Sequence, residues 1–180
     1  MNIVEPIKNI EDIKKIEEFL KKQYIRNYLL FKLGINWGLR ISDILALNIK
    51  DVKNKDWIIL KEKKTKKVKK IPISDNLKQM IIKYVKNKNS EQPLFTSRFN
   101  NRMDRTTAYR IIVQACKAVN IKARIGTHSL RKTFGYHFYK KYNNIALLQK
   151  ILNHSSQDIT LRYIGIDQDE IENAYLNFTI

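Results

Sequence analysis

The sequence contains few of the residues that cross-link or interrupt a chain. Its 180 residues include one cysteine, three prolines and five glycines. A single cysteine excludes an internal disulfide framework, and no Cys and His spacing resembles a zinc site. The chain also has no internal repeat and no low-complexity linker outside one lysine-rich turn. We therefore expect a single domain spanning residues 1–180.

Long apolar runs are also missing. No run approaches the ~20 residues that a membrane-spanning helix needs. The N-terminal stretch MNIVEPIKN lacks the apolar core of a signal peptide. Hydrophobic residues nevertheless make up 43% of the chain, which is enough for a folded core. These features predict a cytoplasmic protein with no membrane partner.

Acidic residues are scarce relative to basic ones. The chain has 17 Asp and Glu against 35 Lys and Arg, which gives a net charge of +18 spread along most of its length. A surface with this charge attracts polyanions, and the commonest partner of such a domain is nucleic acid. The alternative is that a genome of low GC content simply uses lysine often, in which case the charge indicates no partner.

Hydrophobic periodicity predicts a mainly α fold with a small antiparallel β-sheet (α+β). Two short strands, Trp57–Lys61 and Val68–Ile73, flank the lysine-rich turn, and Pro72 confines the second to an edge or to its own end. Helices are predicted at 10–21, Tyr24–Ile35, a short segment after Arg40, Asp75 to about Lys86, Arg105 to about Val119, and Ser129–Lys141. Buried positions are predicted at Ile10, Ile13, Ile16, Phe19 and Leu20 in the first helix, and at Tyr109, Ile112, Val113 and Cys116 in the helix from Arg105.

The stretch from Thr127 to Ile164 contains several residues suited to phosphate chemistry. His128 and Arg131 are three residues apart, so they share one face at the start of the helix predicted there. Free N–H groups and the helix dipole favour an anion at this end, and an arginine adds a planar fork that fits phosphate oxygens. The pair predicts a phosphate-binding site.

His154 and Tyr163 follow, nine residues apart. On one continuous helix this spacing would point the two side chains in opposite directions, at about 100° per residue. The intervening sequence supplies a break, because Asn153 can close a helix in the left-handed conformation and Ser155 or Ser156 can cap the next one. Both side chains can therefore serve one site.

Each candidate also has an ordinary explanation. Arg40 alone would be a surface arginine, His154 a core histidine, and Tyr163 a core tyrosine with its hydroxyl at the edge. Seven of the ten residues from Lys61 to Lys70 are lysine, which is typical of a solvated hairpin tip. The conjunction and order favour function: Gly-Leu-Arg, a lysine hairpin, His-x-x-Arg, then His and Tyr.

That order resembles the tyrosine recombinases, the phage integrase and Xer-type family. GLRISDILAL resembles the segment around their first catalytic arginine, and HSLRKTFG resembles their His-x-x-Arg box. LNHSSQDITLRYIG resembles their closing motif, although Asn153 stands where the family usually has Gly. The hairpin lysine corresponds best to Lys64, eight residues before Pro72, with neighbouring lysines as alternatives. The resemblance thus gives the catalytic set Arg40, Lys64, His128, Arg131, His154 and Tyr163.

The resemblance implies a tyrosine recombinase catalytic-domain fold and site-specific cutting and rejoining of DNA through a 3'-phosphotyrosyl intermediate. Tyr163 would be the nucleophile, His128 its base and Lys64 the acid for the leaving 5'-oxygen. Arg40 and Arg131 would grip the phosphate, to which His154 would donate a hydrogen bond. No metal, ATP or other cofactor is implied. Asp43, one turn after Arg40, is expected to orient neighbouring side chains.

The expected partner is double-stranded DNA, with a tetramer forming on DNA and a monomer or weak oligomer in its absence. DNA contacts are expected from Lys63, Lys66, Lys67, Arg124 and Lys132. The family's usual N-terminal core-binding domain is expected to be absent. The tail 167–180 carries an apolar stripe, Ile171, Ala174, Tyr175 and Phe178, that would dock on a neighbouring protomer or fold back in cis. Two alternatives to recombination are type IB topoisomerase-like strand relaxation and a non-catalytic DNA-binding regulator on the same fold.

Overall fold

The fold is mostly helical, with one two-stranded antiparallel sheet, as predicted. A computed structural model describes residues 4–166 and 175–178. The elements are α1 (Ile10–Gln23), α2 (Ile25–Trp37), α3 (Ile41–Ile44), a 3-10 turn (Ile49–Asp51), β1 (Trp57–Lys61), β2 (Val68–Pro72), α4 (Asp75–Val85), α5 (Arg105–Ala118), α6 (Thr127–Tyr142), α7 (Ile145–Leu152) and α8 (Gln157–Ile164). No helix in the described ranges is both long and apolar enough to cross a bilayer.

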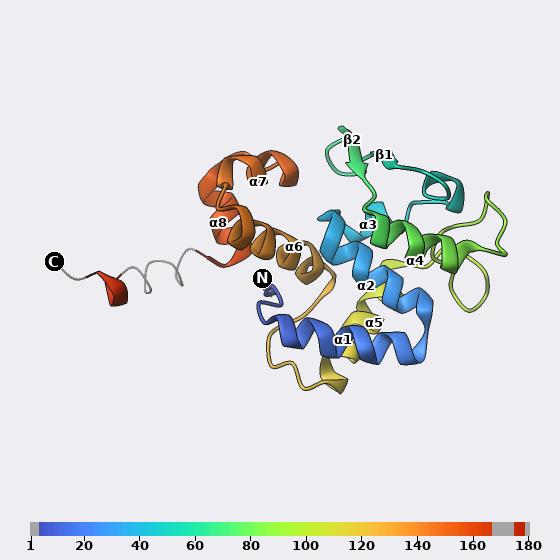
Figure 1. The fold of residues 1–180 in the computed structure, drawn as a ribbon, viewed down its shortest axis with the longest axis horizontal. Helices are drawn as coiled ribbons and strands as arrows, with labels where there is room; N and C mark the ends of the chain where they lie inside the picture. The colour runs from blue at the N-terminus through green and yellow to red at the C-terminus, as the bar shows by residue number, and fades with distance from the viewer. Residues whose placement is uncertain (1–3, 167–174, 179–180) are drawn as a thin grey trace.

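Helix α2 is the centre of the molecule. It is apolar nearly all round, and it packs against α1, α3, α4 and α6. In Figure 1, α1 and α5 lie on one side of the molecule, and the β1–β2 hairpin and the α7–α8 pair lie on the other. The turn after α2 depends on Gly38, whose φ of 58° is left-handed. This turn brings Arg40 to the start of α3.

The β1–β2 hairpin is antiparallel, with Trp57 opposite Pro72 and Lys61 opposite Val68. Pro72 is the last residue of its strand, in agreement with one of the two positions predicted for it. Ile58 is buried, whereas most of the hairpin's other side chains are at least partly exposed. The two strands therefore pack against the rest of the protein through one face only.

Two predicted core residues are exposed. Tyr109 is 47% exposed because α5 buries the face formed by Ala108, Ile112 and Cys116 instead. A residue next to Ala108 in sequence lies about 100° further around the helix. Ile10 is also exposed, since it is the first residue of α1 and the buried face of that helix begins at Ile13.

The closing helices pack tightly on α6. A Cβ atom on Gly135 would lie 2.6 Å from Cγ2 of Ile164, so α8 can approach α6 this closely only because residue 135 is glycine. Asn153 ends α7 in the left-handed conformation predicted for it (φ 55°, ψ 49°). Ser156, one of the two predicted caps, accepts a hydrogen bond from the backbone N–H of Ile159 and starts α8. This break turns Tyr163 back toward α6.

The C-terminal segment 175–178 lies away from the body of the protein (Figure 1). The side chains of Tyr175, Leu176 and Phe178 are strongly exposed. Ile171 and Ala174, the other two members of the predicted apolar stripe, lie outside the described residues.

Candidate active site

Arg131 is fixed in the interior by two backbone carbonyls. Its side chain is 2% exposed. Nη1 donates to the carbonyl oxygen of Gly38 at 2.6 Å, and Nη2 donates to that of Leu152 at 2.5 Å. The guanidinium therefore links the ends of α2 and α7 and has little freedom to turn.

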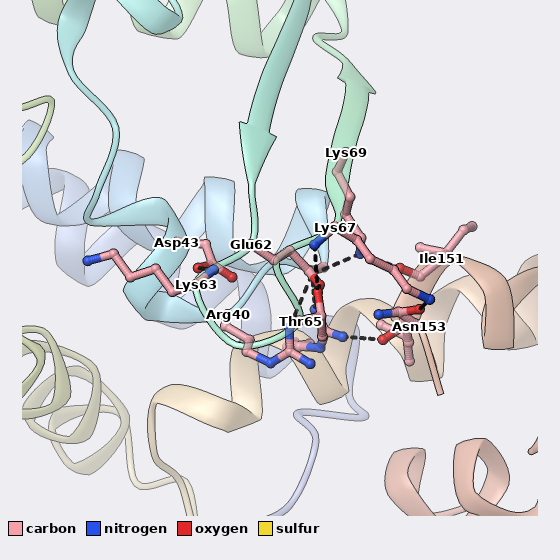
Figure 2. A network of polar contacts seen from close by, with 12 residues as sticks. Arg40, Asp43, Glu62, Lys63, Thr65, Lys67, Lys69, Ile151 and Asn153 are labelled. Carbon is pink, nitrogen blue, oxygen red and sulfur yellow. Dashed lines mark hydrogen bonds and ion pairs between the residues drawn. The ribbon is translucent and has the colours of Figure 1, made fainter. Parts of the chain in front are cut away.

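Arg40 meets Arg131 at a buried carboxylate. Arg40 caps α3, and its side chain is 17% exposed. Its Nη1 lies 3.1 Å from Oε1 of Glu62, and Nη1 of Arg131 lies 3.9 Å from the same oxygen. Figure 2 shows Arg40 and Glu62 within this network of contacts. The two arginines predicted to bind phosphate thus converge, although they are 91 residues apart in sequence.

Tyr163 lies beside this pair of arginines. Burial raises the pKa of its hydroxyl, while the positive charges of Arg131 and Arg40 and a hydrogen bond with Arg131 lower it; the net result is a raised pKa. The aromatic ring packs edge-on against His154, with 4.9 Å between ring centroids. The phenol is thus near both guanidiniums but protonated at neutral pH, so it needs a base in order to act as a nucleophile.

His154 has one ring nitrogen occupied. Its Nδ1 lies 3.2 Å from Oγ1 of Thr160, and the Thr160 hydroxyl donates to the carbonyl of Ser156 at 2.9 Å. The threonine oxygen is therefore the acceptor, which assigns a proton to Nδ1 and leaves Nε2 available for a ligand. Burial and the positive charges of Arg131, Arg40 and Lys69 lower the pKa of His154 to about 4.

His128 and Lys64 line an open groove with Arg40. The groove has a volume of about 960 Å³, and Arg105 and Tyr109 from the first turns of α5 line it as well. Partial burial lowers the pKa of His128, and the positive charges of Arg131, Arg40, Lys132 and Lys64 lower it further. A neutral imidazole at this position can accept a proton.

The lysine hairpin is more than a solvated tip, because its only acidic residue is fully buried. Among residues 61–70 the single acid is Glu62, which is 0% exposed. Besides the arginines it pairs with Lys69, whose Nζ lies 3.2 Å away. The sequence signal that could have identified Glu62 is a lone acid within a run of bases.

The hairpin is also tied to α3 and to the end of α7. The backbone N–H of Lys63 donates to Oδ1 of the buried Asp43 at 3.0 Å. Asp43 therefore holds the backbone of the hairpin, whereas the sequence had suggested that it orients neighbouring side chains. Lys69 donates to the carbonyl of Ile151 at 2.5 Å, and Lys67 donates to Oδ1 of Asn153 at 2.9 Å. Figure 2 shows these contacts from the hairpin to Ile151 and Asn153.

The five residues predicted to contact DNA are placed differently from one another. Lys63, Lys66 and Arg124 are exposed. Lys67 is exposed as well, but its ammonium group binds Asn153. Lys132 is not a surface residue: it is 9% exposed, its Nζ lies 5.1 Å from the ring centroid of Tyr163, and burial lowers its pKa. Lys132 of α6 lies against the tyrosine because α8 packs on α6.

A sequence model of the phage integrase family matches residues 8–170. This chain belongs to the phage integrase family. It is 50% identical, over 99% of its length and 98% of the relative's, to the probable integrase/recombinase YoeC of Bacillus subtilis. It is 28% identical to the tyrosine recombinase XerC of Thermodesulfovibrio yellowstonii, over 83% of this chain and 53% of that protein. The integrase-family chain thus spans nearly all of one relative and about half of the other.

Solved structures of tyrosine recombinases share the fold. The crystal structure of the XerA recombinase superposes with a TM-score of 0.77 at 21% identity, over 96% of this chain and 63% of that one. A lambda integrase tetramer bound to a Holliday junction gives a TM-score of 0.74 at 17% identity, over 91% of this chain and 49% of that one.

Among the described residues, no group of three or more His, Cys, Asp or Glu side chains could hold a metal ion.

Proposed function

We propose that this integrase-family chain is the catalytic domain of a site-specific DNA recombinase that cuts and rejoins strands through a 3'-phosphotyrosyl link. The observation that carries the proposal is the convergence of Arg131 and Tyr163 on Arg40, which itself lines the groove with Lys64 and His128. Covalent trapping on a nicked duplex tests it, as described in the Discussion. Binding without a covalent product would favour a regulator, and relaxation of supercoiled plasmid without synapsis would favour a topoisomerase.

In the proposed reaction, Oη of Tyr163 attacks the scissile phosphorus while the bond from phosphorus to the 5'-oxygen breaks. The phenol proton passes to His128, which is neutral because its pKa is lowered. Lys64 gives a proton to the departing 5'-oxygen. Arg40 and Arg131 stabilise the added negative charge on the two non-bridging oxygens. The covalent link conserves the bond energy, so reversal onto another strand needs no ATP or metal.

His154 would take up a proton when DNA binds. Its Nδ1 already donates to Thr160, so Nε2 can donate to a phosphate oxygen only in the doubly protonated imidazolium form. Its pKa of about 4 keeps the free enzyme's imidazole neutral at pH 7. A phosphate beside Arg131 would offset the positive charges that depress this pKa and would raise it.

The proposed partner is double-stranded DNA, bound by several protomers together. Support comes from the charge of +18 and from the groove that Lys64 and Arg105 line. The lambda integrase of the same fold forms a tetramer on a Holliday junction. We propose the same assembly here, and the exposed side chains of Tyr175, Leu176 and Phe178 offer it an apolar contact surface.

The depressed pKa of His154 predicts a pH-dependent stability. The unfolded state binds a proton near pH 6.5, whereas the folded state resists protonation down to about pH 4. The free energy of unfolding therefore keeps its full value above pH 6.5. It decreases as pH falls from 6.5 toward 4, because only the unfolded state then binds the proton. Thermal melts at pH 7 and pH 5 should show a smaller fall in Tm for His154→Gln than for the unsubstituted protein. Equal falls would show that His154 is not held neutral in the fold.

Substitution of single hairpin lysines should identify the general acid. We expect Lys64→Ala to slow cleavage by about 10²-fold or more, because the 5'-oxygen would leave without a proton. Lys63→Ala and Lys66→Ala should lower DNA affinity slightly and leave the cleavage rate of bound DNA unchanged. A substrate with sulfur in place of the leaving 5'-oxygen should restore the Lys64→Ala rate, since a thiolate needs no protonation. Equal mild effects at all three positions would leave no unique acid.

A further inference from the structure

Glu62 is a fully buried carboxylate surrounded by three cationic groups. Its Oε1 lies 3.1 Å from Arg40, 3.2 Å from Lys69 and 3.9 Å from Arg131. Its Oε2 accepts a 2.5 Å hydrogen bond from the hydroxyl of Thr65 in the same hairpin turn. Within residues 4–166, every ion pair found for Arg40, Arg131 and Lys69 is made to Glu62.

The carboxylate is held in its charged form. Burial alone would raise the pKa of Glu62, but the Thr65 hydrogen bond and the positive charges of Lys69 and Arg40 together outweigh it and lower the pKa. Nη1 of Arg40 and Oε1 of Glu62 are both buried without a well-aligned hydrogen bond. Attraction between charges, more than hydrogen-bond geometry, therefore holds Arg40 in place.

Glu62 also connects the arginines to two other parts of the proposed active site, the hairpin and the end of α7. It lies two residues before Lys64 in the hairpin. Its partner Lys69 donates to the carbonyl of Ile151, and Arg131 donates to that of Leu152, just before His154. A single carboxylate is thus common to the arginines, to the hairpin and to the end of α7.

We propose that Glu62 is a positioning residue for strand cleavage, whose carboxylate aligns Arg40 with the fixed Arg131 to receive the scissile phosphate and anchors the hairpin that carries Lys64. The inference rests on the proposed function. Two guanidinium groups this close repel each other. Arg131 is held by the carbonyls of Gly38 and Leu152, so without an intervening anion Arg40 would move away from it until a phosphate arrived. Glu62 supplies that anion in advance, so alignment is complete before DNA binds.

A negative charge next to a phosphate weakens DNA binding. If Glu62 is a positioning residue, removing its charge should therefore leave DNA affinity unchanged or higher while it slows cleavage. We expect Glu62→Gln, which keeps the shape and can still accept from Thr65, to bind a nicked duplex as tightly as the unsubstituted protein or more tightly. Its single-turnover cleavage of saturating DNA should be slower by about tenfold or more, because misplaced catalytic groups lose that much. Glu62→Asp keeps the charge but withdraws it by one methylene. Its cleavage rate should lie between those of Glu62→Gln and the unsubstituted protein.

The matched control is Glu91→Gln, which removes the same charge from an exposed ion pair with Lys50. It should cleave at the unsubstituted rate. The inference is overturned if Glu62→Gln cleaves at the normal rate or faster, or if binding and cleavage weaken in parallel. If Glu62→Gln gives no cooperative melt, Glu62→Asp decides: slow cleavage with full binding supports the role, and the normal rate overturns it. Absence of covalent product from the unsubstituted protein would instead contradict the proposed function.

Discussion

Tyr163→Phe should abolish covalent attachment of the protein to DNA while leaving DNA binding intact. The substitution removes only the attacking oxygen, and the ring can still pack against His154 and under Lys132. Loss of a nucleophile typically lowers a rate by about 10⁴-fold or more. The measurement uses a nicked duplex from a randomised pool enriched for binding to the protein. The nick lets the cleaved fragment diffuse away and traps the adduct, which is resolved on a denaturing gel in EDTA without ATP.

The matched control for this substitution is Tyr142→Phe, at an exposed tyrosine that ends α6. It should form the adduct normally. Covalent product from Tyr163→Phe at the unsubstituted level would rule out Tyr163 as the nucleophile. Sequencing of the peptide attached to DNA would then show which residue takes its place.

Local sequence signals were sufficient to predict most helices and strands and the approach of His154 to Tyr163. The convergence of Arg40 on Arg131 was expected only from the family resemblance. Asn153 is predicted correctly because the end of its helix needs a left-handed backbone that few residues adopt. The nine-residue spacing of His154 and Tyr163 required a helix break, which Asn153 and Ser156 supply. Pro72 marked the end of its strand because it lacks an N–H group.

The inward-facing charges could not be predicted in the same way. A lysine-rich hairpin has the composition of a solvated turn, and only the fold shows that Glu62 and Lys69 lie under it. Lys132 has the same chemistry as the exposed lysines, and its burial depends on α8 lying close over Gly135. The link from Lys67 to Asn153 joins segments 86 residues apart, which no local pattern encodes. Tyr109 was misplaced because an aromatic residue at helical spacing does not by itself define the buried face.

Arg131→Lys should lower both cleavage and stability, which distinguishes it from the same substitution at Arg40. A lysine has one nitrogen, so it cannot donate to Gly38 and Leu152 together and also present a planar fork to the phosphate. Cleavage of bound DNA should fall by about 10²–10³-fold, the usual effect of removing one preorganised donor. Tm should fall too, because a buried carbonyl is left without its hydrogen bond.

Arg40→Lys provides the internal comparison. Arg40 pairs with Glu62 through charge, and among residues 4–166 no backbone carbonyl is found to accept from its side chain. A lysine ammonium can keep that ion pair, so Arg40→Lys should slow cleavage with little change in Tm. Rates from single-turnover adduct formation and melts followed by circular dichroism give both quantities for each variant. If Arg131→Lys melts like the unsubstituted protein and cleaves normally, the buried fork is not needed, and phosphate binding in this domain must rest on other cations of the groove.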